Sequence, residues 1–418
     1  MGSVMSGFET IESLVLYEDL SERPSASRDL AQFICKMNHL KNLTLNGFHH
    51  DDFYSTSSSM ASTTKIETLV LKEDLSERPS ASRDLAQFIC KMNHLKNLTL
   101  YGYHHDDFYS TSSSMASTTK IETLVLKEDL SERPSASRDL AQFICRMNHL
   151  KNLTLDSHYH DDFYSTASSM ASTSKIETLV LDEDLSERPS ASRDFAQFIC
   201  RMNHLKNLTL DSHYHDDFYS TASSMASTLK IETLVLDEDL SERPSASRDF
   251  AQFICRMNHL KNLTLDSHYH DDFYSTASSM ASTSKIETLV LDEDLSERPS
   301  ASRDFAQFIC RMNHLKNLTL DSHYHDDFYS TASSMASTSK IETLVLDEDL
   351  SERPSASRDF AQFICRMNHL KNLTLDSHYH DDFYSTASSM ASTVKVKYNK
   401  TAQVGVLGVR MQGFVQEC

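Results

Sequence analysis

The sequence predicts an α/β solenoid, a curved array with parallel strands on its concave face and helices on its convex face. Three observations predict this fold. A 55-residue unit recurs almost letter for letter, each unit contains two short apolar/polar alternations, and an apolar stripe of helical spacing follows the first alternation. A fixed period of this kind is typical of a stacked array in which each unit buries its apolar face against its neighbours.

The repeated unit also predicts the domain organisation. Its copies begin at Ile11, Ile66, Ile121, Ile176, Ile231, Ile286 and Ile341. We therefore expect seven units over residues 11–395, a short lead-in at 1–10 and an atypical tail at 396–418. The tail alternates like a strand and would cover the last layer if it belongs to the array. The alternative is that the chain is a fragment of a larger receptor.

Each unit divides into two halves that begin with the same pattern. In the fourth copy, I-x-x-L-x-L starts at Ile176 and opens a 29-residue half, and L-x-x-L-x-L starts at Leu205 and opens a 26-residue half. Alternation with a period of two predicts a strand. Both lengths fall within the range of about 20–29 residues of leucine-rich repeats. Seven units therefore predict fourteen repeats.

The first half of the unit predicts an amphipathic helix of about three turns. Phe195, Phe198, Ile199 and Met202 follow one another at i, i+3, i+4 and i+7, which places them on one face. Cys200 falls on the other side of this helix, so we expect a peripheral cysteine.

The second half of the unit predicts a weaker helix. Asp216 is a suitable N-cap, but serine and threonine dominate the residues that follow it. Hydroxyl side chains compete for backbone hydrogen bonds and lower helix propensity. We expect a short or 3₁₀-like helix.

Charge and cysteine usage bound the partners and the compartment. A net charge of −20 argues against binding to nucleic acid or to an anionic membrane and favours a basic protein partner. One cysteine recurs at the same position of each unit. Cysteines of consecutive units lie two layers apart, and this distance is too long for a disulfide. Reduced thiols, the absence of a signal peptide and the absence of a long apolar stretch predict a cytoplasmic protein without a membrane anchor.

The segment from Ile199 to Leu210, with the doubled L-x-x-L-x-L pattern, resembles leucine-rich repeats of the ribonuclease-inhibitor-like class. It is especially similar to the repeats of NACHT-type cytosolic immune receptors. The resemblance implies a protein-binding role in sensing. Two departures stand out: Asp184 and His213 occupy the ninth position, where the family commonly has Asn or Cys for an interior ladder, and the chain contains no nucleotide-binding P-loop. Copies one and two have Phe48 and Tyr103 in place of His213.

The copies differ mainly at the seventh position of each half, which such repeats present on the concave face. We expect these positions to form the partner-binding surface: Tyr17, Lys72, Lys127, Asp182, Asp237, Asp292 and Asp347 in the first halves, and Asn46, Tyr101, Asp156, Asp211, Asp266, Asp321 and Asp376 in the second halves. Nine aspartates on consecutive strands would lie about 5 Å apart, and each pair would repel by about 1 kcal/mol in water.

The neighbouring positions modify this acidic row. We expect Glu183 and its equivalents to increase the repulsion, while the Glu177 and Lys206 rows alternate in sign and attract. A basic partner would contact the aspartates, with the Tyr17, Lys72, Tyr101 and Lys127 end as a distinct contact zone. A solvated strip copied along with the unit is the alternative interpretation.

Catalysis and metal binding are weakly indicated. The group from His213 to Asp217 holds two imidazoles and two carboxylates that zinc accepts, yet adjacent clusters of this kind are common at turns. Ser, His and Asp recur, but seven regular copies offer no single irregular pocket. His204 precedes a strand, where we expect a surface histidine. We therefore expect no enzyme activity, no metal and no cofactor.

The sequence thus predicts a non-catalytic scaffold that binds a protein, as the sensing or adaptor part of cytosolic innate immune recognition. Two alternatives stay open. One is a ribonuclease-inhibitor-like blocker of a basic enzyme, and the other is a recently duplicated receptor fragment with no independent function. The oligomeric state is left open by the sequence.

Overall fold

The structure, a computed structural model, describes residues 11–391. The predicted lead-in at 1–10, the predicted tail at 396–418 and the last residues of the predicted array lie outside the described residues. The chain forms two compact units, Met1–Leu260 and Lys261–Cys418.

The described part of the first unit contains nine strands and nine helices. The strands are β1 (Ser13–Leu16), β2 (Asn42–Asn46), β3 (Thr68–Lys72), β4 (Asn97–Tyr101), β5 (Thr123–Lys127), β6 (Asn152–Asp156), β7 (Thr178–Asp182), β8 (Asn207–Asp211) and β9 (Thr233–Asp237). The helices are α1 (Pro24–Lys36), α2 (Asp51–Met60), α3 (Pro79–Lys91), α4 (Asp106–Met115), α5 (Pro134–Arg146), α6 (Asp161–Met170), α7 (Pro189–Arg201), α8 (Asp216–Met225) and α9 (Pro244–Arg256). Single 3₁₀ turns follow the second-half helices: η2 (Ala61–Thr63), η3 (Ala116–Thr118), η4 (Ala171–Thr173) and η5 (Ala226–Thr228).

The described part of the second unit repeats the pattern with five strands and five helices. The strands are β10 (Asn262–Asp266), β11 (Thr288–Asp292), β12 (Asn317–Asp321), β13 (Thr343–Asp347) and β14 (Asn372–Leu375). The helices are α10 (Asp271–Met280), α11 (Pro299–Arg311), α12 (Asp326–Met335), α13 (Pro354–Arg366) and α14 (Asp381–Ala391), with 3₁₀ turns η6 (Ala281–Thr283) and η7 (Ala336–Thr338).

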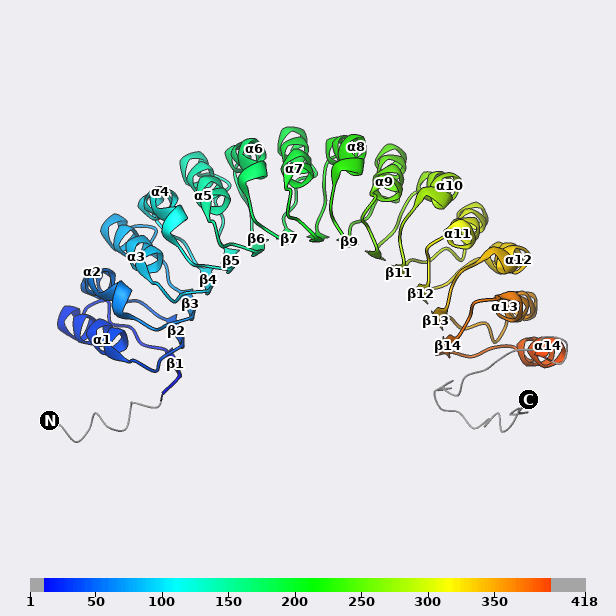
Figure 1. Ribbon diagram of the computed structural model, residues 1–418, viewed down its shortest axis with the longest axis horizontal. Helices are drawn as coiled ribbons and strands as arrows, with labels where there is room; N and C mark the ends of the chain where they lie inside the picture. Colours follow the sequence, from blue (N-terminus) through cyan, green and yellow to red (C-terminus); the bar gives the residue numbers. More distant parts are fainter. Residues whose placement is uncertain (1–10, 392–418) are drawn as a thin grey trace. The chain divides into compact units, whose positions relative to one another are not determined.

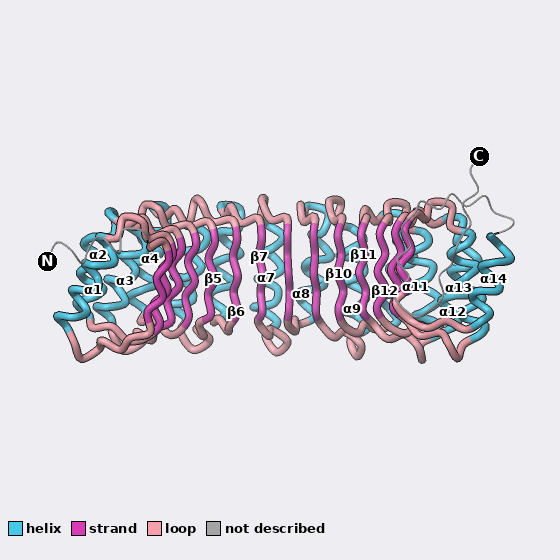
Figure 2. The backbone as a smooth tube through the Cα atoms, turned by 90° about the horizontal axis from the view of Figure 1, so that it is seen from below, coloured by secondary structure: helices cyan, strands magenta, loops and turns pink. Residues whose placement is uncertain are grey.

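Within each unit the strands form a parallel sheet in which every strand pairs with the next one along the chain. Between β7 and β8, Leu179 lies opposite Leu208 and Leu181 opposite Leu210. In the first unit the strands line the inner side of a curve and the helices its outer side (Figure 1). Figure 2 shows the strands side by side in front of the helices. The predicted leucine-rich-repeat-like solenoid, with strand and helix in every repeat, is therefore confirmed.

The core of each layer lies between its strand and its helix. Leu179, Leu181, Leu208 and Leu210 are at most 1% exposed, because alternate strand residues point to the same side. The predicted helical stripe is confirmed: Phe195, Phe198, Ile199 and Met202 are buried. The helix itself ends one residue before Met202, which is its C-cap.

Cys200 is buried, so the expectation of a peripheral cysteine is wrong. The reason is that α7 packs against both α6 and α8, so the flanks of the helix are covered as well as its core face. The seven repeat cysteines are free thiols, as the spacing argument predicts. Burial raises the pKa of the Cys200 thiol to about 12.

The second-half helices begin differently from the prediction. His215, not Asp216, is the N-cap of α8, and its Nδ1 accepts a hydrogen bond from the Asp217 backbone at 3.2 Å. The helix runs for ten residues before a 3₁₀ turn, longer than a short or 3₁₀-like helix alone. Phe218 and Tyr219 are buried along it. Their packing supplies stability that the serine-rich sequence lacks, as tertiary contacts do for most helices.

We predict that Leu210→Ala lowers the free energy of unfolding by about 2–5 kcal/mol, because it opens a cavity in a fully packed layer. Leu375→Ala, at the equivalent position of β14, is the matched control. Leu375 is only half-buried, so its loss should be smaller. Urea unfolding followed by circular dichroism measures both, and equal losses would contradict the layered packing.

Candidate protein-binding surface

The variable seventh positions lie at or just beyond the carboxyl ends of the strands. Because Leu179 and Leu181 point into the core, Val180 and Asp182 point to the opposite, inner face of the sheet. Asp182 is exposed there, and Asp156 lies directly opposite it across the β6–β7 pair. The structure thus brings the predicted seventh-position residues of each unit into one row on the inner face.

The aspartates form what we call the acidic strip, one stretch in each unit. Its members are Asp156, Asp182, Asp211 and Asp237 in the first unit, and Asp266, Asp292, Asp321, Asp347 and Asp376 in the second. Direct register pairs join Asp211 with Asp237, Asp266 with Asp292, and Asp321 with Asp347.

Electrostatic repulsion within the acidic strip acts on Asp182, Asp292 and Asp347, and it helps to raise the pKa of each. Partial burial raises the pKa of Asp182, and the carboxylates of Asp156 and Asp211 raise it further. The same causes act on Asp292, whose neighbours are Asp321 and Asp266. A nearby cation would relieve this repulsion.

The first copies present a different chemistry at the same positions. The Lys72 ammonium lies 4.9 Å from the centre of the Tyr101 ring, and the Lys127 ammonium lies 5.9 Å from it on the next strand. Lys127 also forms an ion pair with Asp156, where the acidic strip begins. We call Tyr17, Asn46, Lys72, Tyr101 and Lys127 the lysine–tyrosine patch. Cation–π contacts of this kind contribute about 0.5–1 kcal/mol at exposed sites.

The ninth position of the second half is at the surface, so the expected interior ladder at this position is absent among the described residues. Phe48 and Tyr103 are 49% and 50% exposed, and His213 is exposed. The residue at the tenth position is buried instead: it is His49 in copy one and Tyr214 in copy four. Continuing the strand alternation beyond Leu210 to the tenth position would have identified it.

Two depressions accompany these surfaces. A cleft of about 530 Å³ in the first unit is lined by Tyr103, Glu77, Asp129 and Glu132, together with other loop residues. A second depression, of about 330 Å³, lies on the acidic strip of the second unit, where Asp292, Asp321, His323 and Asp347 line it. Arg133 also lines the first cleft. The second depression holds three aspartates of the acidic strip, a charge that suits a cationic side chain.

The favourable Glu177 and Lys206 rows are confirmed. The Lys206 ammonium lies 2.8 Å from the Glu177 carboxylate, and the same pair recurs as Lys96 with Glu67 at 2.8 Å. These ion pairs lie on exposed side chains, so each contributes little to stability. They bring opposite charges together in the Glu177 and Lys206 rows.

The expectation that Glu183 increases the repulsion of the acidic strip is wrong, because its side chain is buried. One carboxylate oxygen accepts hydrogen bonds from the Tyr159 backbone at 2.9 Å and from Arg188 at 3.0 Å. The alternation Leu179, Leu181, Glu183 already places it on the core side. In copies one to three, His49 and His104 contribute a ring nitrogen to the equivalent glutamates, at 3.4 Å from Glu73 and 2.9 Å from Glu128.

Burial raises the pKa of Glu183 to about 8, although the Tyr159 amide and Arg188 lower it. Glu238 and Glu348 are raised to about 8 for the same reason. A neutral glutamate fits this place because the Arg188 guanidinium already donates to the Asp161 carboxylate at 2.9 Å. The arginine charge is therefore balanced without an ionised Glu183.

The structure separates the side chains of the His213 to Asp217 group. His213 is exposed, His215 caps α8, and Asp216 forms an ion pair with Arg243. Within residues 11–391, no three His, Cys, Asp or Glu side chains gather into a group that would hold a metal ion. The ninth-position Asp184 instead accepts a hydrogen bond from the Ser186 backbone at 2.8 Å and so stabilises its loop. His204 is exposed, as predicted, with Lys175 at 3.4 Å.

Comparison with known proteins adds no family assignment. No family model matches the chain, and no curated protein matches it significantly. No helix among the described residues is long and apolar enough to cross a membrane.

We predict that the protein loses stability as the pH rises from 6.5 to 8.5. The folded-state pKa of Glu183, Glu238 and Glu348 is about 8, above the ordinary value of about 4.3. Their contribution is fully present below the ordinary value and is lost as the pH rises through about 8. The slope reaches at most about 1.4 kcal/mol per pH unit for each glutamate.

The triple variant Glu183→Gln, Glu238→Gln, Glu348→Gln should flatten this pH dependence in thermal unfolding. Glu187→Gln, in an exposed loop, is the control and should leave it unchanged. A wild-type melting temperature that stays constant or rises over this range would show that the buried glutamates are ionised.

Proposed function

We propose that the protein is a non-catalytic scaffold that binds a basic protein partner through the acidic strip. The observation that carries the proposal is the row of aspartates on the inner face of each unit, in which Asp156 lies opposite Asp182 and Asp211 lies opposite Asp237. Such an arrangement costs free energy in the isolated protein and is relieved by cationic side chains. A regular inner sheet face is also the extended surface that repeat proteins use for binding.

The shape of the surface supports a protein partner over a small ligand. The depression on the acidic strip is open and lined almost entirely by polar side chains, unlike the apolar enclosed pockets of small molecules. A chain segment rich in lysine or arginine would place successive cations along the strip. The half-exposed Tyr103 and the lysine–tyrosine patch provide the aromatic contacts that protein interfaces favour.

Within this role we propose the sensing or adaptor part of cytosolic innate immune recognition. The support is the resemblance of the segment from Ile199 to Leu210 to the repeats of NACHT-type receptors, together with the repeat fold. A ribonuclease-inhibitor-like blocker would use the same acidic strip, and the identity of the captured partner distinguishes the two: a signalling protein for the first, a basic enzyme for the second.

The prediction concerns charge reversal on the acidic strip. Asp211→Lys, Asp237→Lys and Asp266→Lys together should abolish capture of the partner at low salt, because attraction is replaced by repulsion. For the unchanged protein, capture should weaken as the salt concentration rises. Pull-down from cell extract at two salt concentrations, quantified by mass spectrometry, measures both effects.

The matched control reverses the same number of charges elsewhere. Glu187→Lys, Glu242→Lys and Glu297→Lys change exposed loop residues outside the strip and should leave specific capture in place. If the strip variant retains the partner, or if both triple variants lose it equally, the acidic strip is not the binding surface.

A further inference from the structure

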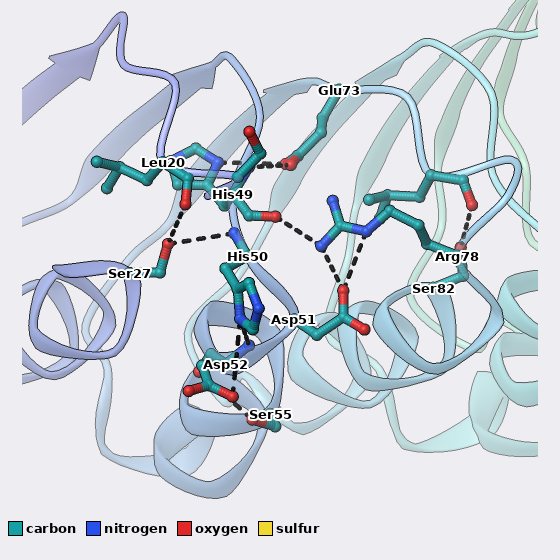
Figure 3. A network of polar contacts seen from close by, with 12 residues as sticks. Leu20, Ser27, His49, His50, Asp51, Asp52, Ser55, Glu73, Arg78 and Ser82 are labelled. Atoms are coloured by element: carbon teal, nitrogen blue, oxygen red, sulfur yellow. Dashed lines mark hydrogen bonds and ion pairs between the residues drawn. The ribbon is translucent and has the colours of Figure 1, made fainter. Parts of the chain in front are cut away.

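Consecutive copies of the repeated unit meet through one recurring polar contact. At the junction of copies one and two, Arg78 donates to the Asp51 carboxylate at 3.0 Å and to the His49 carbonyl at 2.6 Å (Figure 3). The same guanidinium lies 5.6 Å from the centre of the Tyr54 ring. The later copy thus supplies the arginine, and the earlier copy supplies the carboxylate, the carbonyl and the ring.

This contact is present at all six junctions between the seven copies. The pairs are Arg78 with Asp51, Arg133 with Asp106, Arg188 with Asp161, Arg243 with Asp216, Arg298 with Asp271, and Arg353 with Asp326. Strand pairing accompanies each one, as between β2 and β3, where Leu43 lies opposite Leu69 and Leu45 opposite Leu71. The junction is therefore a well-defined interface that the chain repeats within itself.

Copy one carries the arginine side of this interface, and no earlier copy among the described residues contacts it. Arg23 occupies the position of Arg78, and its guanidinium makes no ion pair or hydrogen bond with the described residues. Glu18 is exposed, whereas its equivalent Glu73 is buried. Leu14 and Leu16 on β1 are only half-buried, although the same leucines in later copies are in the core.

Copy seven carries the opposite side of the same interface, with the aspartate and the tyrosine ring. Asp381 has no arginine partner among residues 11–391, unlike its six equivalents. The Tyr384 side chain is 49% exposed, whereas Tyr329 in copy six is fully buried beneath Arg353. Leu373 and Leu375 on β14 are half-buried. An exposed strand edge beside apolar side chains is a surface that favours pairing with another chain.

The two end faces are complementary because the interface between such faces already exists six times in the chain. We propose that the protein associates head to tail, with the copy-seven face of one chain docking on the copy-one face of a second chain. Arg23 of the second chain binds Asp381 and covers the Tyr384 ring of the first. The strand β14 pairs with β1 in the register of the internal junctions, with Leu373 opposite Leu14 and Leu375 opposite Leu16.

This association differs from the proposed binding of a basic partner, because it uses the ends of the array and leaves the acidic strip uncovered. The contact is heterologous: the surface that docks differs from the surface that receives. Such contacts extend into open chains unless the rotation closes a ring. Each added molecule continues the sheet by one complete copy junction.

Analytical ultracentrifugation of the full chain over a wide concentration range tests the proposal. We expect the weight-average mass to rise with concentration beyond that of a dimer. A monomer mass at every concentration would overturn it.

Variants identify the docking faces. Arg23→Asp alone and Asp381→Arg alone should each weaken association by roughly tenfold or more, as loss of one partner of an interfacial charge pair does. Mixing the two single variants should restore growth beyond a dimer, with the two kinds of molecule alternating, because every contact between unlike molecules again joins opposite charges. The double variant should again form longer species, because the charge pair is exchanged within one interface.

A control separates these effects from net charge and from folding. Glu187→Arg changes the charge by the same amount as Asp381→Arg but lies in an exposed loop, and it should associate like the unchanged protein. Circular dichroism should show all variants folded, because Arg23 and Asp381 are exposed or half-exposed. If the single variants associate as strongly as the control, or if mixing them restores nothing, the head-to-tail contact is wrong.

Discussion

From copy two onward, the arginine before each first-half helix joins one copy of the unit to the previous one, and the rest of the structure depends on it. Arg188 contacts Asp161, the Tyr159 carbonyl, the Tyr164 ring and the buried Glu183 at once. These groups come from two copies, so the contact fixes the distance and the register between layers. The leucines then meet in line across the strands, and the aspartates of each unit form a row because they follow the leucines by one position.

The buried glutamate has a more specific role than the leucines. A single carboxylate receives the backbone of the previous layer and the arginine of its own layer. An apolar side chain at this place would leave the Tyr159 amide without a partner, which costs more than the hydrogen bond itself contributes. The polar contact inside each layer therefore selects one docking arrangement among those that leucine packing alone would permit.

The sequence is sufficient to predict the layers but not all the details of their edges. The spacing of Leu179, Leu181, Leu208 and Leu210 predicts the strands, and the stripe from Phe195 to Met202 predicts the helix. Cys200 was misplaced because a single helix considered alone has a free flank, whereas in the array both sides are covered by neighbouring helices.

The other differences have the same origin. His215 is the N-cap in place of Asp216, because Asp216 forms an ion pair with Arg243 of the next copy. These two residues are 27 positions apart in the sequence. The exposed Phe48 and Tyr103 and the buried Glu183 are found only by extending the strand alternation past the last leucine. The predicted row of aspartates is present within each unit, because that placement follows from strand geometry alone.

The near identity of the copies has a consequence for folding. The surface that copy three presents to copy four is almost the same as the surface that copy two presents to copy three. During folding, a copy can dock on the next copy but one instead of on its true neighbour. The skipped unit then forms a loop, and the entropy lost in closing this loop is little more than that lost in closing a shorter loop. Native and shifted arrangements share almost all their contacts, so few interactions oppose the error. The substitutions in copies one to three are among the few features that distinguish one register of the array from the next.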